Sequence, residues 1–307
     1  MKVSVVATVK DAGEAVGPFL ESLAAQTRAP DEVIVVDGGS TDGTAERLRR
    51  AEGITLIEEP GANIARGRNL AIAAATHDVI AVTDADCVLE PRWLERLLVP
   101  LEAGADVAMG FYRPIAEGFL ERCMAAINLP DPDEIDPARF MPSARSIAFR
   151  REAIETAGGY PEWLDIGEDM FVNHRWRELG LDRRFAPDAV VRWRLRGTLH
   201  ETWTQYVRYA RGDAVAGMFP ERHALRLAVY GGALSALGSR GRLRKLAVAA
   251  AGLTYVATPM RRAMRRFDDP IERAAALVAV PALMAFVDAA KMAGYLAGLR
   301  AARGDAA

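Results

Sequence analysis

The first third of the chain alternates short apolar runs with segments of helical spacing. Four runs rich in β-branched residues are typical of buried strands, and they occupy residues 3–9, 33–36, 54–57 and 79–83. Three segments between them repeat apolar residues at helical spacing, at residues 19–24, 45–50 and 66–75. This alternation predicts an α/β fold, in which a mostly parallel sheet carries helices on both faces.

Further along, the same patterns predict strands at residues 148–153 and 185–193, with a helix at residues 170–179 between them. Ser40 or Thr41 is the expected N-cap of the helix at residues 45–50, because their hydroxyls accept hydrogen bonds from the first turn.

The composition of the chain changes near residue 220. Three apolar stretches follow, separated by basic clusters at residues 240–245 and 261–266; the stretches are residues 227–239, 246–260 and 274–287. Residues 1–220 carry 25 basic and 35 acidic side chains, a net charge of −10, whereas the remainder carries 14 and 6, a net charge of +8. We therefore predict an α/β domain at residues 1–220 and a basic, apolar helical segment at residues 221–307.

No uncharged run in this segment reaches the roughly 18 to 20 residues of an ordinary spanning helix. We predict interfacial helices, with apolar faces in lipid and arginines on an anionic membrane surface. Two alternatives stay open: helices that pack on the domain or on a second subunit, and a tilted span at residues 274–299. The basic stripe lacks the interleaved aromatic residues of a single-strand binder, so we expect no nucleic acid.

The compartment is expected from the first residues and the cysteines. The first 17 residues contain no long apolar run and no small-residue cleavage site, so no signal peptide is predicted. Cys87 and Cys123 belong to no Cys-x-x-Cys motif or Cys/His cluster, which favours a reducing compartment. With the basic segment, this predicts the cytoplasmic face of a membrane, with peripheral or weakly integral attachment.

The strongest local signal for chemistry is an apolar strand that runs into Asp84 and Asp86, one residue apart. Hard carboxylate oxygens select Mg²⁺ or Mn²⁺, and such a cation would stabilise a nucleotide diphosphate as it leaves. The alternative is a solvated turn with two surface aspartates.

Two further segments are candidates. In the loop at residues 37–44, Gly39 allows a close backbone approach and Asp37 could accept hydrogen bonds from a nucleobase or ribose. Glu168 and Asp169 precede a helix, and Asp169 is the candidate base that would take a proton from an attacking hydroxyl. The alternatives are a turn with a helix cap, and acidic residues favoured at a helix N-terminus.

Taken in order, these segments resemble the successive blocks of glycosyltransferase family 2. The blocks are residues 33–44, 84–86, 149–151 with 158–160, and 167–169. The resemblance covers roughly the first 210 residues, and the order of the motifs makes it specific. It implies a Rossmann-like GT-A fold with a mixed sheet, an inverting mechanism, a nucleoside-diphosphate sugar donor and a divalent metal.

The resemblance also implies roles for single residues. Asp37 would contact the base, Asp84 the ribose or metal, Asp86 the metal, and Asp169, beside Glu168, would be the general base. The residues expected to bind the nucleotide are Thr8, Asp11, Asp37, Gly39, Arg66, Asn69 and Asp84. Around Asp11 the chain departs from the family, which often has Asn-Glu there. For Arg66 and Arg68 an exposed helix face is the alternative.

Residues 205–209 resemble the family's Q-x-x-R-W block, with Tyr209 in place of Trp. Under this resemblance Arg208 would neutralise the diphosphate, and Gln205 lies in the same block. Arg192, outside the block, is a further candidate for contact with phosphate or acceptor. The alternatives are a packed amphipathic helix and a strand end with solvated charges.

The expected function is sugar transfer from a nucleoside-diphosphate donor, with UDP-sugars favoured, to a hydroxyl of a lipid-linked or saccharide acceptor. Such a reaction would serve cell-envelope polysaccharide synthesis. A non-catalytic nucleotide-sugar-binding scaffold on the membrane is one alternative. A sugar nucleotidyltransferase is more distant, because the chain lacks the Gly-rich, Lys-containing signature near its first strand.

Overall fold

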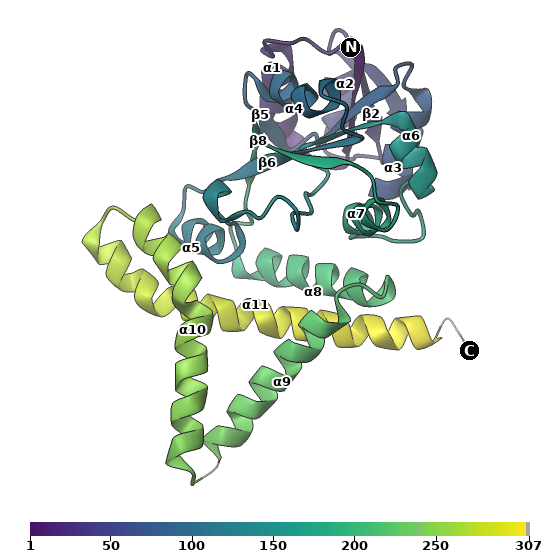
Figure 1. Ribbon diagram of the computed structural model, residues 1–307. Helices are drawn as coiled ribbons and strands as arrows, with labels where there is room; N and C mark the ends of the chain where they lie inside the picture. The colour runs from purple at the N-terminus through teal and green to yellow at the C-terminus, as the bar shows by residue number, and fades with distance from the viewer. Residues whose placement is uncertain (239, 305–307) are drawn as a thin grey trace. The chain divides into compact units, whose positions relative to one another are not determined.

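A computed structural model describes residues 1–238 and 240–304 of the chain (Figure 1). It divides into two compact units: the first joins Met1–Ile115 to Asp131–Arg194, and the second joins Ala116–Pro130 to the residues from Leu195 onward. The division falls earlier than the expected boundary at residue 220. Helix α8, Leu199–Val215, belongs to the second unit because it packs along α11, Pro270–Gly304.

An eight-stranded sheet forms the centre of the first unit, with strand order β3-β2-β1-β4-β7-β6-β8-β5. The strands are β1 Val3–Val9, β2 Glu32–Asp37, β3 Thr55–Glu58, β4 Val79–Asp84, β5 Cys87–Leu89, β6 Val107–Ile115, β7 Ile147–Arg150 and β8 Arg183–Arg194. Strands β3, β2, β1 and β4 run parallel, as do β6 and β8; β7 is antiparallel to both its neighbours, and β5 to β8. The predicted mixed, mostly parallel sheet is confirmed.

Helices cover both faces of this sheet. The helical segments of the first unit are η1 Gly13–Ala15, α1 Val16–Ala24, α2 Thr44–Arg49, α3 Ile64–Ala74, α4 Trp93–Glu102, η2 Pro132–Glu134, α6 Arg151–Ala157 and α7 Glu168–Glu178. Ile147 packs with residues of α3, α6 and α7, whereas the preceding Ser146 accepts a hydrogen bond from the indole of Trp93 in α4. Because neighbouring strand positions point to opposite faces, α4 lies on the face opposite α3, α6 and α7.

Two local expectations are wrong. The strand expected at residues 148–153 ends at Arg150, and α6 begins at Arg151, so half of that segment is helical. The N-cap of α2 is Gly43, with a φ of 88°, rather than Ser40 or Thr41. The hydroxyl of Ser40 is used instead within the loop after β2, where it donates to Asp37.

The described part of the second unit is helical, as expected for the C-terminal segment. Besides α8 and α11 it contains α5 Phe119–Asn128, α9 Pro220–Leu237 and α10 Arg242–Arg266. Cys123 and Ala126 of α5 pack with Phe267 and with Val280 of α11 in a buried apolar cluster. The consecutive helices α9 and α10 contact each other (Figure 1).

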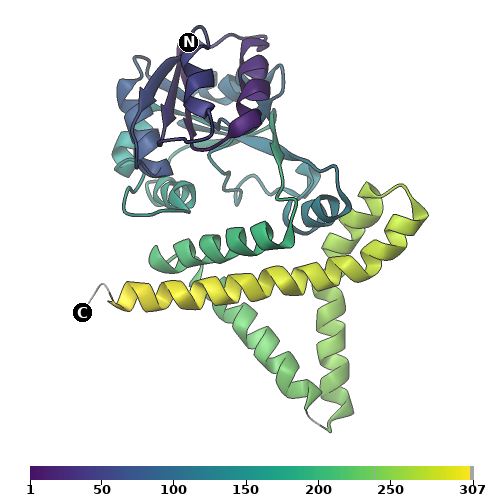
Figure 2. The same cartoon turned by 180° about the vertical axis from the view of Figure 1, so that it is seen from behind.

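Helices α8 and α11 lie side by side in both views (Figures 1 and 2). Two glycines of α11 allow this approach: a Cβ atom at Gly294 would lie 2.1 Å from the Val207 carbonyl oxygen, and one at Gly298 would lie 2.6 Å from that of Arg211. Of the helices described, the stretch Pro270–Ala302 is long and apolar enough to cross a membrane, judged by length and composition alone.

Candidate active site

Three polar residues lie at the carboxyl ends of adjacent parallel strands. Thr8 of β1 is in register with Asp84 of β4, and Asp37 of β2 is in register with Val9. In open α/β sheets, ligands bind at this edge. The sequence prediction that these residues gather at one edge therefore agrees with the register. Thr8 also lies beneath α3, because a Cβ atom at Gly67 would lie 2.9 Å from the Thr8 methyl carbon.

Asp37 organises the loop that follows β2. Its buried carboxylate accepts hydrogen bonds from the backbone N–H groups of Gly39 and Ser40, each at 3.0 Å, and from the Ser40 hydroxyl. Gly39 has a φ of 90°, a left-handed conformation that suits glycine. Asp11 reaches the same loop, where its Oδ1 accepts from the Thr41 N–H at 2.7 Å. The loop is therefore a preformed backbone cradle at the end of β2.

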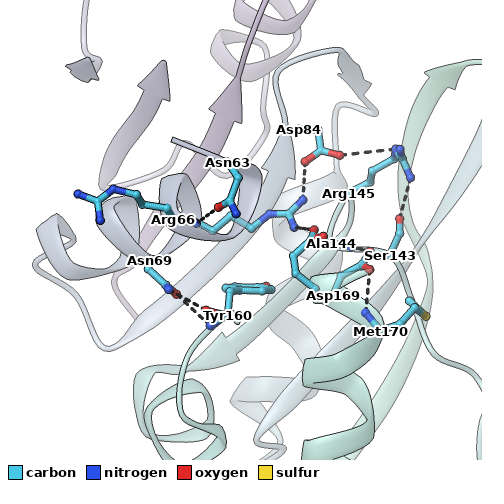
Figure 3. A network of polar contacts seen from close by, with 12 residues as sticks. Asn63, Arg66, Asn69, Asp84, Ser143, Ala144, Arg145, Tyr160, Asp169 and Met170 are labelled. Atoms are coloured by element: carbon cyan, nitrogen blue, oxygen red, sulfur yellow. Dashed lines mark hydrogen bonds and ion pairs between the residues drawn. The ribbon is translucent and has the colours of Figure 1, made fainter. Parts of the chain in front are cut away.

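Asp84 faces two guanidinium groups (Figure 3). Its Oδ1 accepts a hydrogen bond from Nη2 of Arg68 at 2.8 Å, and its Oδ2 lies 3.6 Å from Nε of Arg145. Arg68 also forms an ion pair with Glu168 at the start of α7. Only 2% of the Arg68 side chain is exposed, so this cation joins two carboxylates from distant parts of the chain inside the protein.

Arg68 is the residue of this block that the sequence prediction left out of the site, and the exposed helix face considered for it is wrong. Arg66, chosen instead, is 48% exposed and pairs with Glu59 and Glu162 at the surface. The signal was present in the spacing: Ala65, Arg68 and Ile72 recur at positions i, i+3 and i+7 of α3, on the face that packs onto the sheet. Arg66 lies off that face.

Two acidic residues begin α7 and differ in environment. Glu168 is buried, and this burial raises the pKa of its carboxyl to about 7, although Arg68 acts in the opposite direction. Asp169 is partly exposed, and its Oδ2 accepts a hydrogen bond from the Ala144 N–H at 3.2 Å (Figure 3). The residue before them, Gly167, has a φ of 89°, which turns the chain into the helix. Of the two, Asp169 has the access to solvent that an incoming hydroxyl requires.

Asn69 ties α3 to the loop before α7 (Figure 3). Its amide nitrogen donates to the Tyr160 carbonyl oxygen at 2.8 Å, and its amide oxygen accepts from the Tyr160 N–H at 2.9 Å. The guanidinium of Arg68 in turn lies over the Tyr160 ring, with its Cζ atom 5.3 Å from the ring centroid. Asn69 therefore supports the site by holding the loop.

A divalent cation would have few protein ligands here. Within residues 1–238 and 240–304, no group of three or more His, Cys, Asp or Glu side chains could hold a metal ion. Mg²⁺, however, is commonly bound by one or two carboxylates together with substrate phosphates. The donor set of Asp84 and Asp86 fits that mode only with a diphosphate present, because Arg68 and Arg145 now face Asp84.

The structure does not bring Arg192 to this cluster. It forms an ion pair with Glu90 at 2.6 Å. The next residue, Trp193, lies 4.2 Å below the guanidinium of Arg145, and adjacent strand positions point to opposite faces. Gln205 and Arg208 lie on α8 in the second unit, where Gln205 donates to the Tyr209 hydroxyl at 3.1 Å and Arg208 is exposed. The roles expected for these two stay predictions.

Comparison with known proteins gives the family of this site. Residues 4–156 match the family model described as Glycosyl transferase family 2. The chain is 28% identical over 199 residues to "Glycosyltransferase AglE" of Haloferax volcanii, a match that covers 61% of this chain and 65% of that relative's length. The chain thus spans somewhat less than two thirds of that curated relative.

Solved structures share the fold. The mannosyltransferase PcManGT from Pyrobaculum calidifontis, in complex with GDP-Man and Mn²⁺, is 21% identical with a TM-score of 0.56, over 97% of this chain and 87% of the other. S. aureus TarS 1-349 in complex with UDP-GlcNAc is 17% identical with a TM-score of 0.55, over 99% and 92%. At these identities the likeness establishes the GT-A architecture.

Proposed function

The chain belongs to glycosyltransferase family 2, and from that premise we propose that it is a glycosyltransferase, which transfers a sugar from a nucleoside-diphosphate donor to an acceptor hydroxyl with inversion. One observation carries the proposal. The buried Arg68 connects Asp84, at the sheet edge where a donor would bind, to the start of α7, where Asp169 is partly exposed. A single cation thereby links the carboxylate of Asp84, in the expected donor site, to the helix that begins beside the candidate base.

In the proposed reaction, the acceptor oxygen attacks the anomeric carbon while the bond from that carbon to the diphosphate oxygen breaks. Asp169 takes the proton of the hydroxyl. Glu168 is unsuited to this role, because it is buried and paired with Arg68. Attack opposite the departing diphosphate gives inversion.

The donor would lie against the Asp37 loop and the end of β4. The solved structures that share the fold hold different nucleotide sugars, GDP-Man in PcManGT and UDP-GlcNAc in TarS, and we keep a UDP-sugar as the first donor to test. Asp84 and Asp86 would hold Mg²⁺ or Mn²⁺, which supplies charge stabilisation to the leaving diphosphate. Arg145 would then move from Asp84 towards a phosphate oxygen, a contact that guanidinium groups favour.

We also propose that the second unit attaches the enzyme peripherally to the cytoplasmic face of a membrane. The α9–α10 hairpin, residues 220–266, exposes large apolar side chains, among them Leu234, Leu243, Leu246 and Leu253. Its turn exposes a cluster of cations, namely Arg240, Arg242, Arg244 and Lys245. Apolar side chains beside cations suit an anionic lipid surface. A lipid-linked acceptor would be reached on such a surface.

The test of the base is the Asp169→Asn variant, assayed for sugar transfer with a UDP-sugar and Mn²⁺. We expect kcat to fall at least about a hundredfold while donor binding is kept, because general-base catalysis contributes roughly 10²–10⁴ in rate. Asp165→Asn, an exposed carboxylate four residues earlier, is the matched control and should transfer normally. Normal turnover by Asp169→Asn would exclude this residue as the base.

Donor and metal binding are tested separately. Asp86→Ala should lose the stabilisation that UDP with Mn²⁺ gives to the wild type in a thermal-shift measurement. Stabilisation by UDP that is unchanged by a chelator would remove the metal from the proposal. Sugar transfer or donor hydrolysis with Mn²⁺ that is absent with a chelator would exclude the non-catalytic scaffold, and the match to glycosyltransferase family 2 argues against a nucleotidyltransferase.

A further inference from the structure

The second unit contains a cavity of about 240 Å³ between α5, α10 and α11. Ile127 and Asn128 of α5, Tyr255 of α10, and Met284, Asp288 and Lys291 of α11 lie along its wall. The volume is several times the roughly 30 Å³ share of one water molecule. Tyr255 is 49% exposed, so the cavity reaches the surface.

The negative charge in this cavity already has its partners. Asp288 is buried and accepts three hydrogen bonds: from Nε of Arg226 at 2.7 Å, from the Tyr230 hydroxyl at 2.9 Å and from the Tyr255 hydroxyl at 2.6 Å. A carboxylate with a guanidinium and two hydroxyl donors is compensated inside a protein. It has no need of a further cation.

The positive charge of Lys291 is in the opposite situation. Its ammonium lies 4.8 Å from the centroid of the Tyr206 ring, and within the described residues no carboxylate lies at salt-bridge distance from it. Burial, together with the guanidinium of Arg226, lowers the pKa of Lys291 to about 8, although the more distant carboxylates of Asp288 and Asp213 act in the opposite direction. A desolvated cation without a counter-ion is unfavourable, and an anion placed in the cavity would relieve the cost.

We propose that this cavity binds the phosphate group of an amphiphile, that is, a phosphate carried on an apolar chain. Lys291 would donate to the phosphate oxygens. Asn128 would add a second donor, because one amide hydrogen is used on the Met124 carbonyl oxygen, at 3.0 Å, and the other remains. Ile127 and Met284 would contact the first methylene groups of the chain, and the rest of the chain would leave past Tyr255.

This inference deepens the proposed function by giving a lipid-linked acceptor a place where it is held. Its test measures binding and never sugar transfer. Failure of the binding test therefore leaves the transfer reaction standing, and loss of transfer by Asp169→Asn leaves this site standing.

The experiment is a thermal-shift titration of the full chain with octyl phosphate below its micelle concentration. Octanol and inorganic phosphate at the same concentrations separate the apolar and anionic contributions. Dihexanoyl phosphatidylglycerol carries the phosphodiester of a membrane lipid, whereas octyl phosphate is a phosphomonoester. Stabilisation by either compound supports the site, and the compound that stabilises more shows which kind of phosphate the site binds.

We expect octyl phosphate to stabilise the wild type and the Lys291→Met variant to bind it at least about tenfold more weakly, as expected for a lost hydrogen bond to a charged group. Lys291→Arg should retain binding, and Lys2→Met, at an exposed lysine of the first unit, should bind as the wild type does. If Lys291→Met does not fold, Asn128→Leu tests the second donor. The proposal is overturned if Lys291→Met binds normally, or if octanol or inorganic phosphate alone gives the full shift.

Discussion

A single buried cation determines how the first unit joins its two acidic groups. Arg68 contacts Asp84 of β4 and Glu168 of α7, whose side chains are largely buried. Replacing it by methionine would leave Glu168 without its ion-pair partner and Asp84 with Arg145 alone. Breaking a buried ion pair in this way costs about 3–5 kcal/mol, whereas an exposed pair contributes about 0–1 kcal/mol.

We therefore predict that Arg68→Met lowers the free energy of unfolding by about 3–5 kcal/mol in urea denaturation. The matched control is Arg66→Met, two residues away on the same helix, where the pairs with Glu59 and Glu162 are exposed. That variant should lose about 1 kcal/mol or less. Equal losses for the two variants would mean that the buried ion pairs of Arg68 contribute no more to the free energy of unfolding than the exposed pairs of Arg66.

The buried carboxyl of Glu168 gives a pH dependence whose sign follows from its pKa. Burial raises that pKa from 4.5 to about 7, so the folded protein holds this proton more tightly than the unfolded chain does. The stabilisation is fully present below about pH 4.5 and is lost as the pH rises through about 7. Relative to Glu168→Gln, the wild type should become less stable between pH 5 and 8. Parallel pH profiles of the two unfolding free energies would contradict this.

At the scale of elements, the sequence predicts strands whose residues are mostly apolar, and it misses features that depend on how the elements pack. Strands β1, β2 and β4 are predictable, because apolar runs buried on both faces need no further information. Strand β6 is missed, since Gly110, Arg113 and Pro114 interrupt its pattern, and β5 has only three residues. The gathering of Asp37 and Asp84 follows from the strands being parallel. The pairing of Arg68 follows only from the rotation of α3 about its axis.

The boundary between the units illustrates the same limit. A charge count places a change at residue 220, yet α8 belongs to the second unit because of its packing on α11. The close approach depends on Gly294 and Gly298, four residues apart on one face of α11. Small residues at this spacing let helix backbones touch. A charge count cannot detect a contact made by backbone atoms.

This contact gives a prediction for the second unit. Gly294→Ala places a methyl group 2.1 Å from the Val207 carbonyl oxygen, so the two helices must move apart. We expect a loss of about 1–3 kcal/mol, typical of overpacking, and faster amide hydrogen exchange in α8. Ala297→Leu adds more volume at an exposed position of α11, with a helix propensity close to that of alanine, and should change neither quantity. Unchanged exchange in Gly294→Ala would show that α8 and α11 are not packed in this way.

At the scale of the whole molecule, charge is divided between a net −10 at residues 1–220 and +8 beyond them. An anionic membrane would therefore attract the second part and repel the first. The cations at the turn of the α9–α10 hairpin are all exposed, so they can reach lipid headgroups without changing the fold. Each basic side chain near an anionic surface contributes about 1 kcal/mol, and salt weakens the attraction.

Vesicle flotation measures this attachment. The full chain should float with vesicles that contain phosphatidylglycerol, less with phosphatidylcholine alone, and less again as salt is raised. A hairpin variant should bind at least about tenfold more weakly, since three charges amount to about 3 kcal/mol. That variant replaces Arg242, Arg244 and Lys245 by Gln; its control makes the same change at three exposed cations of the first unit, Lys2, Arg50 and Arg139.

Extraction then separates a surface attachment from a span. Peripheral attachment through the hairpin leaves a protein that high salt or alkaline carbonate removes from the vesicles, because interfacial helices are held by charge and a shallow apolar face. A span formed by α11 would resist both treatments, and the hairpin variant would then stay bound. Helices that serve only to join two copies of the chain would leave wild type and variant equally unbound. Flotation that is sensitive to salt, lost in the hairpin variant and retained in its control variant is expected only if the exposed cations hold the enzyme on the lipid.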